Sequence, residues 1–287
     1  MLTESPFEDL LTLFEQLPDH DGQAVDDLRS SLYEKHSVFS PNGDDMIEWM
    51  SWLAAWQGKP KVALRESHIC LFASSYEGGG DENNAVEFAD LAGRGVTPIN
   101  HLCKDRGLGL RVLELAPSIP HNLDTSWTER ECMAACAFGM EATAAGGDLL
   151  GLSAVSEGGD KVAINLIEKI EALVSSESGA LGVLRCMQEN AGREIAALVG
   201  AMLAARSRRL PVLLEGWPAL AAMKVIHEIN ASAVAHVRVA SVSGAQQRRV
   251  VSSLEQCSLL SPSCTMPSGC GVALAISTLF PLIELAK

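Results

Sequence analysis

The spacing of apolar residues changes in kind at about residue 60. Before it, apolar side chains recur at helical spacing in SPFEDLLTLFEQL (residues 5–17), with Ser5 in the position of an N-cap. The segment MIEWMSWLAAW (residues 46–56) predicts a second helix, whose aromatic side chains belong to a core. The first part of the chain is therefore predicted to be helical.

From residue 61 onward, short continuous apolar runs alternate with helical stretches. The runs are HICLFAS (68–74), LRVLELA (110–116), PVLLEG (211–216) and AVAHVRVAS (233–241), and DLLGLSAV (148–155) is a fifth candidate strand. Continuous runs are typical of strands that are buried on both faces, and helices between them indicate βαβ crossovers. The pattern predicts an α/β fold with a Rossmann-like, largely parallel sheet flanked by helices.

The same pattern suggests how the chain is divided. We expect an N-terminal helical subdomain over residues 1–60, an α/β core over residues 61–260, and a C-terminal glycine turn and helix over residues 261–287. Because both ends are helical, we expect them to pack together as a small helical subdomain that completes the site. The segment IAALVGAMLAA (195–205) is apolar all round, which predicts a helix buried inside the protein and too short to cross a membrane.

Composition and charge narrow the range of partners. The formal net charge of −14 disfavours binding to nucleic acid or to an anionic membrane surface. The N-terminus lacks the basic and apolar regions of a secretory leader, and the eight cysteines form no CxxC pair, which indicates reduced thiols in the cytoplasm. Cys132 and Cys136 share a helix face without histidines at metal-ligand spacing, so we expect no metal and no cofactor.

Glycine turns follow several of the predicted strands, at the edge where ligands bind in a parallel sheet. In SEGGDK (156–161), Gly158 precedes a helix with Lys161 in its first turn, which suits a phosphate, and an ordinary strand-to-helix turn that contains two glycines is the alternative. In TMPSGCGVALA (265–275), a Gly-x-Gly turn opens an apolar helix and Ser268 stands just before it. The residues alone therefore indicate an α/β protein whose turns suit an anionic metabolite.

The order of several segments resembles the nicotinate-nucleotide–dimethylbenzimidazole phosphoribosyltransferases, a family of cobalamin lower-ligand synthesis. The similar segments are IEWMSWLAAWQGKP (47–60), ADLAGRGVTPINHLCKDRGLGLRVLELA (89–116), TERECMAACAFGMEATAAGGDLL (128–150) and AGREIAALVGAMLAARSRRLPVLLEGWPALAA (191–222). The resemblance implies transfer of phosphoribose from nicotinate mononucleotide to an aromatic base. It also implies a homodimer, with a heterodimer with an active relative as the alternative.

The comparison with the family's motifs also identifies what this chain lacks. The family carries Gly-Glu-Gly-Thr-Gly before its last helix, with the glutamate as the proposed general base, and Ser268 stands at that position here. A second functional glutamate of the family falls at Ala154, for which Glu157 is a candidate substitute. The Asp and His of the family's Phe-Ala-Gly-Asp-His-Gly segment are absent from FASSYEG (72–78). Serine is not basic near neutral pH, so the catalytic residues are unknown.

Contacts to the nucleotide are expected from backbone groups and one hydroxyl. The residues are Gly158, Gly192, Gly216, Ser241, Gly269 and Gly271. Two hypotheses follow. In the first, the chain is a phosphoribosyltransferase with impaired or altered activity. In the second, it is a catalytically inactive paralogue that acts as a nucleotide-binding, base-binding or partner protein.

Overall fold

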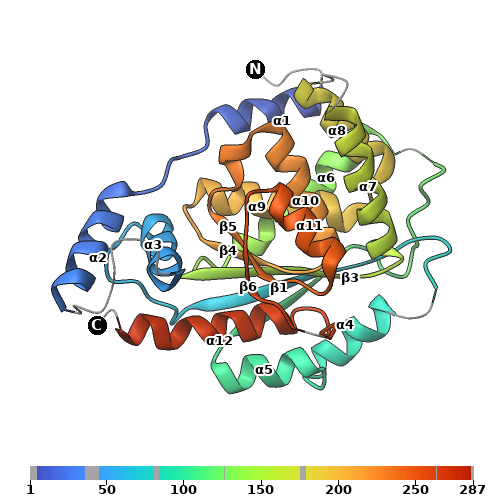
Figure 1. Ribbon diagram of the computed structural model, residues 1–287. Helices are drawn as coiled ribbons and strands as arrows, with labels where there is room; N and C mark the ends of the chain where they lie inside the picture. The colour runs from blue at the N-terminus through green and yellow to red at the C-terminus, as the bar shows by residue number, and fades with distance from the viewer. Residues whose placement is uncertain are drawn as a thin grey trace.

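The computed structural model describes residues 5–35, 45–80, 84–125, 127–174, 179–262 and 264–285. Within them, six parallel strands form one sheet in the order β2-β1-β3-β4-β5-β6 (Figure 1). The strands are β1 (Ser67–Ser75), β2 (Gly109–Glu114), β3 (Leu149–Glu157), β4 (Val212–Leu214), β5 (Val237–Ser241) and β6 (Ser258–Leu260). The predicted parallel α/β sheet is confirmed, and the short strand β6 is an addition that the apolar pattern did not predict.

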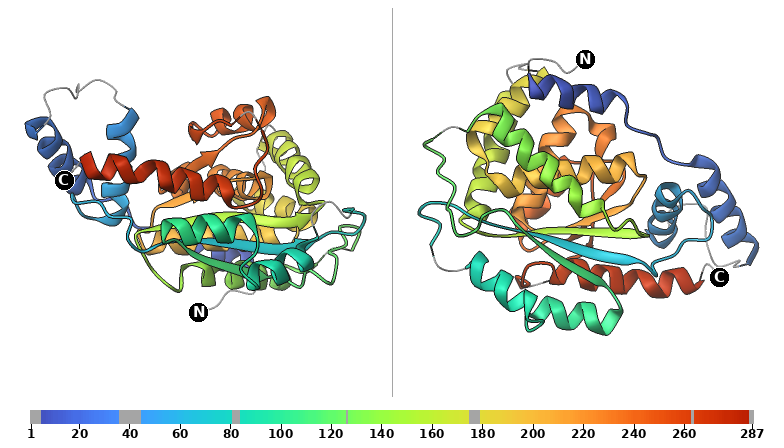
Figure 2. Two further views of the ribbon diagram at one scale, coloured as in Figure 1. Left: turned by 90° about the horizontal axis from the view of Figure 1, so that it is seen from below. Right: turned by 180° about the vertical axis from the view of Figure 1, so that it is seen from behind.

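Helices cover both faces of the sheet (Figures 1 and 2). One face carries α1 (Pro6–Glu15), α6 (Glu129–Gly139), α7 (Gly159–Val174), α8 (Gly179–Asn190), α9 (Arg193–Ser207), α10 (Trp217–Ile229) and α11 (Ala245–Ser253). The other face carries α4 (Ala85–Gly93), α5 (Pro98–Arg106) and α12 (Cys270–Leu285). Two 3₁₀ helices, Met140–Thr143 and Ala231–Val234, precede β3 and β5.

Strand β1 shows why the strands read as continuous apolar runs. Every residue of β1 is buried. Cys70 and Phe72 pack into the layer that contains α9, whereas Ile69 and Leu71 pack into the layer that contains α12. Because successive side chains face opposite sides of a strand and both sides are covered by helices, apolar or small residues occupy all positions of β1 except His68.

The remaining two helices lie where the strands begin. These are α2 (Gly22–Lys35) and α3 (Asp45–Gln57), which pack against each other. Trp56 Nε1 donates a hydrogen bond to Ala235 O (3.1 Å), just before β5, and Gln57 Nε2 donates to Asp148 O (2.9 Å), just before β3. The end of α3 is therefore fixed against the amino ends of the strands.

The helices from the two ends of the chain form two groups, α1 in one and α2, α3 and α12 in the other. α1 packs against α6 and α8, and Ser5 Oγ donates to Glu129 Oε2 (2.9 Å). α2 and α3 instead share a hydrophobic cluster with α12. Figure 2 shows α1 apart from the α2–α3 pair. The division of the chain at residues 60 and 260 stays a prediction.

Helix α9 is buried on all sides, as its uniformly apolar sequence predicts. It contacts β1, β3, α6 and α10. The crossing with α6 is close enough to require glycine in both helices: a Cβ on Gly200 would lie 1.8 Å from Cys136 O, and a Cβ on Gly139 would lie 1.8 Å from Ala197 O. Backbone atoms of α6 and α9 thus touch directly, which holds α9 in a fixed position against the sheet.

Replacing Gly200 with alanine should destabilise the protein by roughly 1–3 kcal/mol, because the added methyl group forces two helix backbones apart. The matched control is Gly93→Ala, because a Cβ on Gly93 would meet no atom within 4 Å. Denaturant unfolding of both variants measures the difference in the free energy of unfolding. Equal stabilities of the two variants would contradict the close crossing of α6 and α9.

Candidate functional site

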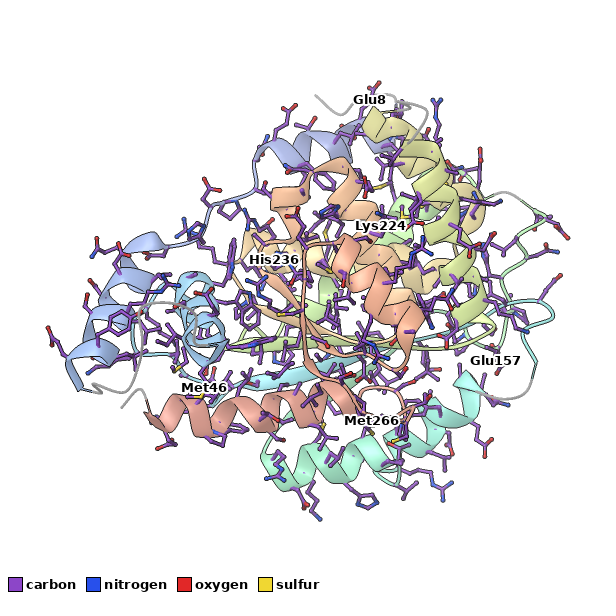
Figure 3. All side chains as sticks on the ribbon, viewed as in Figure 1. Glu8, Met46, Glu157, Lys224, His236 and Met266 are labelled. Carbon is purple, nitrogen blue, oxygen red and sulfur yellow. The ribbon has the colours of Figure 1, made fainter. Side chains whose placement is uncertain are left out.

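A cleft of about 350 Å³ opens at the carboxyl ends of β3, β4 and β5. It is lined by Ala154 and Ser156 from β3, Glu215 after β4, Ser241 from β5, and Ser268 before α12. Met266 from the same loop also lines the cleft (Figure 3). This edge of a parallel sheet is the usual place for a ligand, because strand ends and helix N-termini meet there.

Glu215 is a nearly fully buried carboxyl in this cleft, with 6% of its surface exposed. Its Oε2 accepts hydrogen bonds from Val272 N (2.8 Å) and Ser241 Oγ (3.4 Å). Burial raises the pKa of Glu215 to about 7, and the hydrogen bonds from the turn before α12 and from Ser241 oppose this shift. The side chain therefore changes its charge near neutral pH.

The Gly-x-Gly turn before α12 is shaped around this carboxyl. Gly269 has a φ of +81°, a conformation that glycine adopts at little cost. A Cβ on Gly271 would lie 2.1 Å from Glu215 Oε2 and 2.3 Å from Ser241 Oγ. The turn from which the sequence predicts nucleotide contacts thus faces a carboxyl of the chain itself, with Ser268 in the adjoining cleft wall.

Four of the six predicted nucleotide contacts come together around Glu215. They are Gly216, Ser241, Gly269 and Gly271. Gly216, which has a φ of +87°, begins the loop into α10 and lines the cleft. The structure therefore brings these four residues to one place, and their contact with a nucleotide stays a prediction.

The other two predicted contacts, Gly158 and Gly192, lie under the loop that follows β1. Gly192 N donates to Tyr76 Oη (2.9 Å), and a Cβ on Gly192 would lie 2.6 Å from that oxygen. A Cβ on Gly158 would lie 2.9 Å from Gly79 Cα. Both glycines permit a close approach of protein atoms, and neither lines the cleft.

A second buried carboxyl, Glu194, lies next to the cleft. Its Oε1 accepts hydrogen bonds from Tyr76 Oη (2.7 Å) and from Ser156 Oγ (3.3 Å), and Ser156 also lines the cleft. Its Oε2 has no hydrogen-bond partner within the part of the chain that the structure describes. Burial raises the pKa of Glu194, and the hydrogen bond from Tyr76 opposes this shift.

Sequence reasoning did not select Glu194 or Glu215 as site residues. Each had a signal, because each is an acidic residue within or directly after an apolar run: REIAALVG (193–200) and PVLLEG (211–216). A charged side chain is rarely fully buried unless it is paired, so a carboxylate placed in such a run indicates a specific partner.

Ala154 and Ser268, the two positions at which the resemblance implies glutamates, both line the cleft. Neither residue carries a carboxylate, and their assignment to the family's glutamates stays a prediction. The substitute candidate Glu157 lies elsewhere. Its Oε1 accepts a hydrogen bond from Ala85 N (3.1 Å), at the start of α4 (Figure 3). Because Glu157 is three residues from Ala154 on the same strand, its side chain faces the opposite side of the sheet.

Among the described residues, no three His, Cys, Asp or Glu side chains lie close enough together to hold a metal ion. In those same residues, no helix has both the length and the apolar character that a bilayer crossing requires. The eight cysteines are free thiols, and Cys132 and Cys136 are buried in α6.

The parallel sheet and the cleft at its carboxyl edge define an α/β protein with a ligand-binding architecture, and a family model described as "Phosphoribosyltransferase" matches residues 163–286. The chain belongs to the nicotinate-nucleotide–dimethylbenzimidazole phosphoribosyltransferase family. It is 31% identical over 309 aligned positions to the family member of Rhizobium etli (strain CIAT 652), with 94% of this chain and 90% of the relative covered. The resemblance seen in the sequence is therefore confirmed.

Two further comparisons agree. The family member of Agrobacterium fabrum is 31% identical over 313 positions, which cover 94% of this chain and 89% of that protein. The crystal structure of the nicotinate-nucleotide–dimethylbenzimidazole phosphoribosyltransferase from Thermus thermophilus superimposes with a TM-score of 0.77 at 20% identity, covering 93% of this chain and 96% of the other. At that identity, the structural match shows the fold.

Glu215 should give stability a characteristic pH dependence. Its pKa is about 7 in the folded protein against a reference value of 4.5, so the unfolded chain releases the proton first. The contribution of Glu215 to the free energy of unfolding is therefore fully present below about pH 4.5, and it falls by roughly 3 kcal/mol as the pH rises through 7. In Glu215→Gln, which cannot ionise, this part of the pH dependence should disappear.

Denaturant unfolding of the wild type and Glu215→Gln between pH 5 and pH 8 measures this effect. Glu168→Gln is the matched control, because Glu168 is exposed on α7. Parallel stability curves for the wild type and Glu215→Gln would show that the carboxyl of Glu215 ionises normally.

Proposed function

We propose that the chain transfers phosphoribose from nicotinate mononucleotide to an aromatic base, at a rate lowered by the absence of the family's two glutamates. One observation carries the proposal: the carboxyl of Glu215, with a pKa of about 7, lines the same cleft as Ser268. Ser268 stands where the family's general base is implied. A carboxyl with a pKa near the working pH is well suited to accept a proton in the transition state.

The reaction requires one proton acceptor and a fixed position for the sugar. A ring nitrogen of the aromatic base forms a bond to the anomeric carbon of the ribose as the bond from that carbon to nicotinate breaks. The electron pair of the broken bond stays on the ring nitrogen of nicotinate, which needs no proton. The N–H proton of the attacking base passes to Glu215. Gly216 and Ser241 adjoin this carboxyl and provide backbone and hydroxyl groups for positioning.

A different observation favours a second function. Glu215 Oε2 already accepts hydrogen bonds from Val272 N and Ser241 Oγ. A proton taken up by this oxygen would compete with the two hydrogen bonds, which fix the turn. This arrangement supports a catalytically inactive paralogue that binds a nucleotide or an aromatic base, or that pairs with an active relative. In both cases we propose a homodimer, with a heterodimer with an active family member as the alternative.

The experiment that separates the two functions is an assay of nicotinate release. The purified chain is incubated with nicotinate mononucleotide and dimethylbenzimidazole, beside the Rhizobium etli relative. Release that depends on the aromatic base supports the transferase. Absence of release, together with a thermal shift induced by the mononucleotide or co-purification with the relative, supports the inactive paralogue. Absence of all three would exclude both proposals.

Replacing Ser268 with glutamate should raise the rate of transfer by about 10²–10⁴-fold, because it returns a carboxylate to the position of the family's base. Ser268→Gln is the matched control, since it has nearly the same size without the negative charge. Initial rates of nicotinate release measure the gain. A folded Ser268→Glu variant that is no faster than Ser268→Gln would contradict the assignment of this position.

The rate in the wild type should rise with pH and level off above about pH 7, because only the ionised form of Glu215 accepts a proton. Glu215→Gln should lower the rate by about 10² or more and remove this pH dependence. Measuring kcat/KM between pH 5.5 and 8.5 for both proteins tests the prediction. An unchanged pH profile in Glu215→Gln would show that another group accepts the proton.

A further inference from the structure

A second cavity, of about 640 Å³, lies between the loop that follows β2, helix α6 and the start of α9. None of the residues that line it also lines the cleft. Its volume falls within the range of small-molecule sites. Its walls combine three aromatic rings, of His121, Trp127 and Phe138, with the guanidinium group of Arg193.

The aromatic wall is preformed by contacts within the protein. The ring of His121 lies edge-on to Trp127, with centroids 4.9 Å apart, and edge-on to Tyr76 at 5.9 Å. Trp127 is held in place because its indole N–H donates to Gln188 O and Gln188 Nε2 donates to Trp127 O. Phe138 projects from α6 with 40% of its surface exposed. A planar ring could therefore pack here without reordering the wall.

Arg193 brings a fixed positive charge to this cavity. Its Nη1 donates to three backbone carbonyls, Leu115 O (3.0 Å), Ala116 O (3.1 Å) and Ile119 O (2.8 Å). Carbonyl groups orient the guanidinium and leave its charge in place. Within the described ranges of the chain, no carboxylate forms an ion pair with Arg193. A fixed guanidinium that forms no ion pair within the protein favours an anionic ligand.

One carboxylate, that of Glu131, also lines the cavity, but it forms no ion pair with Arg193. The carboxylate of Glu131 is used in the capping box at the start of α6, and that of Glu77 accepts a hydrogen bond from Asn122 Nδ2 (2.8 Å). Burial, together with the charge of Arg193, lowers the pKa of His121, which keeps the imidazole neutral. In the described part of the chain its ring makes no hydrogen bond, so a nitrogen is free for a ligand.

We propose that this cavity binds a planar aromatic carboxylate. The ring of the ligand packs against Trp127 and Phe138, and its carboxylate pairs with Arg193. The imidazole of His121 makes a second hydrogen bond to the ligand. The proposal does not depend on phosphoribosyl transfer, because the cavity shares no residue with the cleft. A second copy of the chain and a segment of another protein are the other occupants that the test must separate.

The probe is benzoate, titrated into the full chain and followed by ligand-observed NMR. Benzamide, which is neutral and of similar shape, should bind at least about tenfold more weakly, since it lacks the charge that pairs with Arg193. Arg193→Gln should weaken benzoate binding by at least about tenfold and leave benzamide unchanged. Arg130→Gln is the matched control, because Arg130 is exposed on α6 outside the cavity. It should bind benzoate as the wild type does.

Two further variants keep the test decisive. Trp127→Leu removes the aromatic wall without touching Arg193 and should weaken benzoate and benzamide alike. Ser241→Ala alters the cleft alone and should leave benzoate binding unchanged. Thermal unfolding of each variant shows whether the fold is intact.

Several outcomes would overturn the proposal. They are absence of benzoate binding in the millimolar range, equal affinity for benzamide, and binding that survives in a folded Arg193→Gln variant. Loss of binding in Ser241→Ala but not in Arg193→Gln would place the ligand in the cleft. If the chain does not bind benzoate but self-associates, and Phe138→Ser abolishes the self-association, the occupant of the cavity is a second copy of the chain.

Discussion

The carboxyl of Glu215 joins the end of β4 to the start of α12 through its hydrogen bond with Val272 N and its contact with Ser241. Burial penalises the charge, and the amides at the start of α12 offset part of that cost, which is why the pKa is raised only to about 7. The same contact explains the glycine at position 271, where a Cβ would collide with this carboxyl. It also fixes the turn that carries Ser268, and hence one wall of the cleft.

The topology decides where such a cleft can form. The connection from β1 leads to β2 at one edge of the sheet, and the connection from β2 leads back to β3 on the other side of β1. The order in which strands are added to the sheet therefore reverses between β1 and β3. Ligands often occupy this position in open α/β sheets. Here Tyr76 fills part of it, bonded to Gly192 and to the buried carboxyl of Glu194. The open space therefore lies farther along the sheet, at β3, β4 and β5.

Membership of the family and the state of its site are separate findings. The α/β fold is that of the family, and packing explains the buried α9 and the glycine turn of this chain. The chemistry of the cleft follows from a few side chains, because function depends on the groups that meet at a site and not on the fold that carries them. Ala154 and Ser268 bring no carboxylate to the cleft, whereas Glu215 lines it and the buried carboxyl of Glu194 lies next to it.

The amino-acid sequence by itself determined which segments are buried. Continuous apolar runs identified β1, β3, β4 and β5, and the uniformly apolar segment 195–205 identified α9, because a segment buried on all sides needs apolar residues along its length. An apolar run also identified β2, an edge strand in which no residue is fully buried. The order of segments also assigns Ala154 and Ser268 to positions of the family's motifs, and this assignment stays a prediction. What each buried polar group contacts was not recorded locally. Val272 is 57 residues from Glu215, and Gly192 is 116 residues from Tyr76. Only the tertiary structure brings such distant groups together, because the partner of a charge or an amide depends on which elements the fold places side by side.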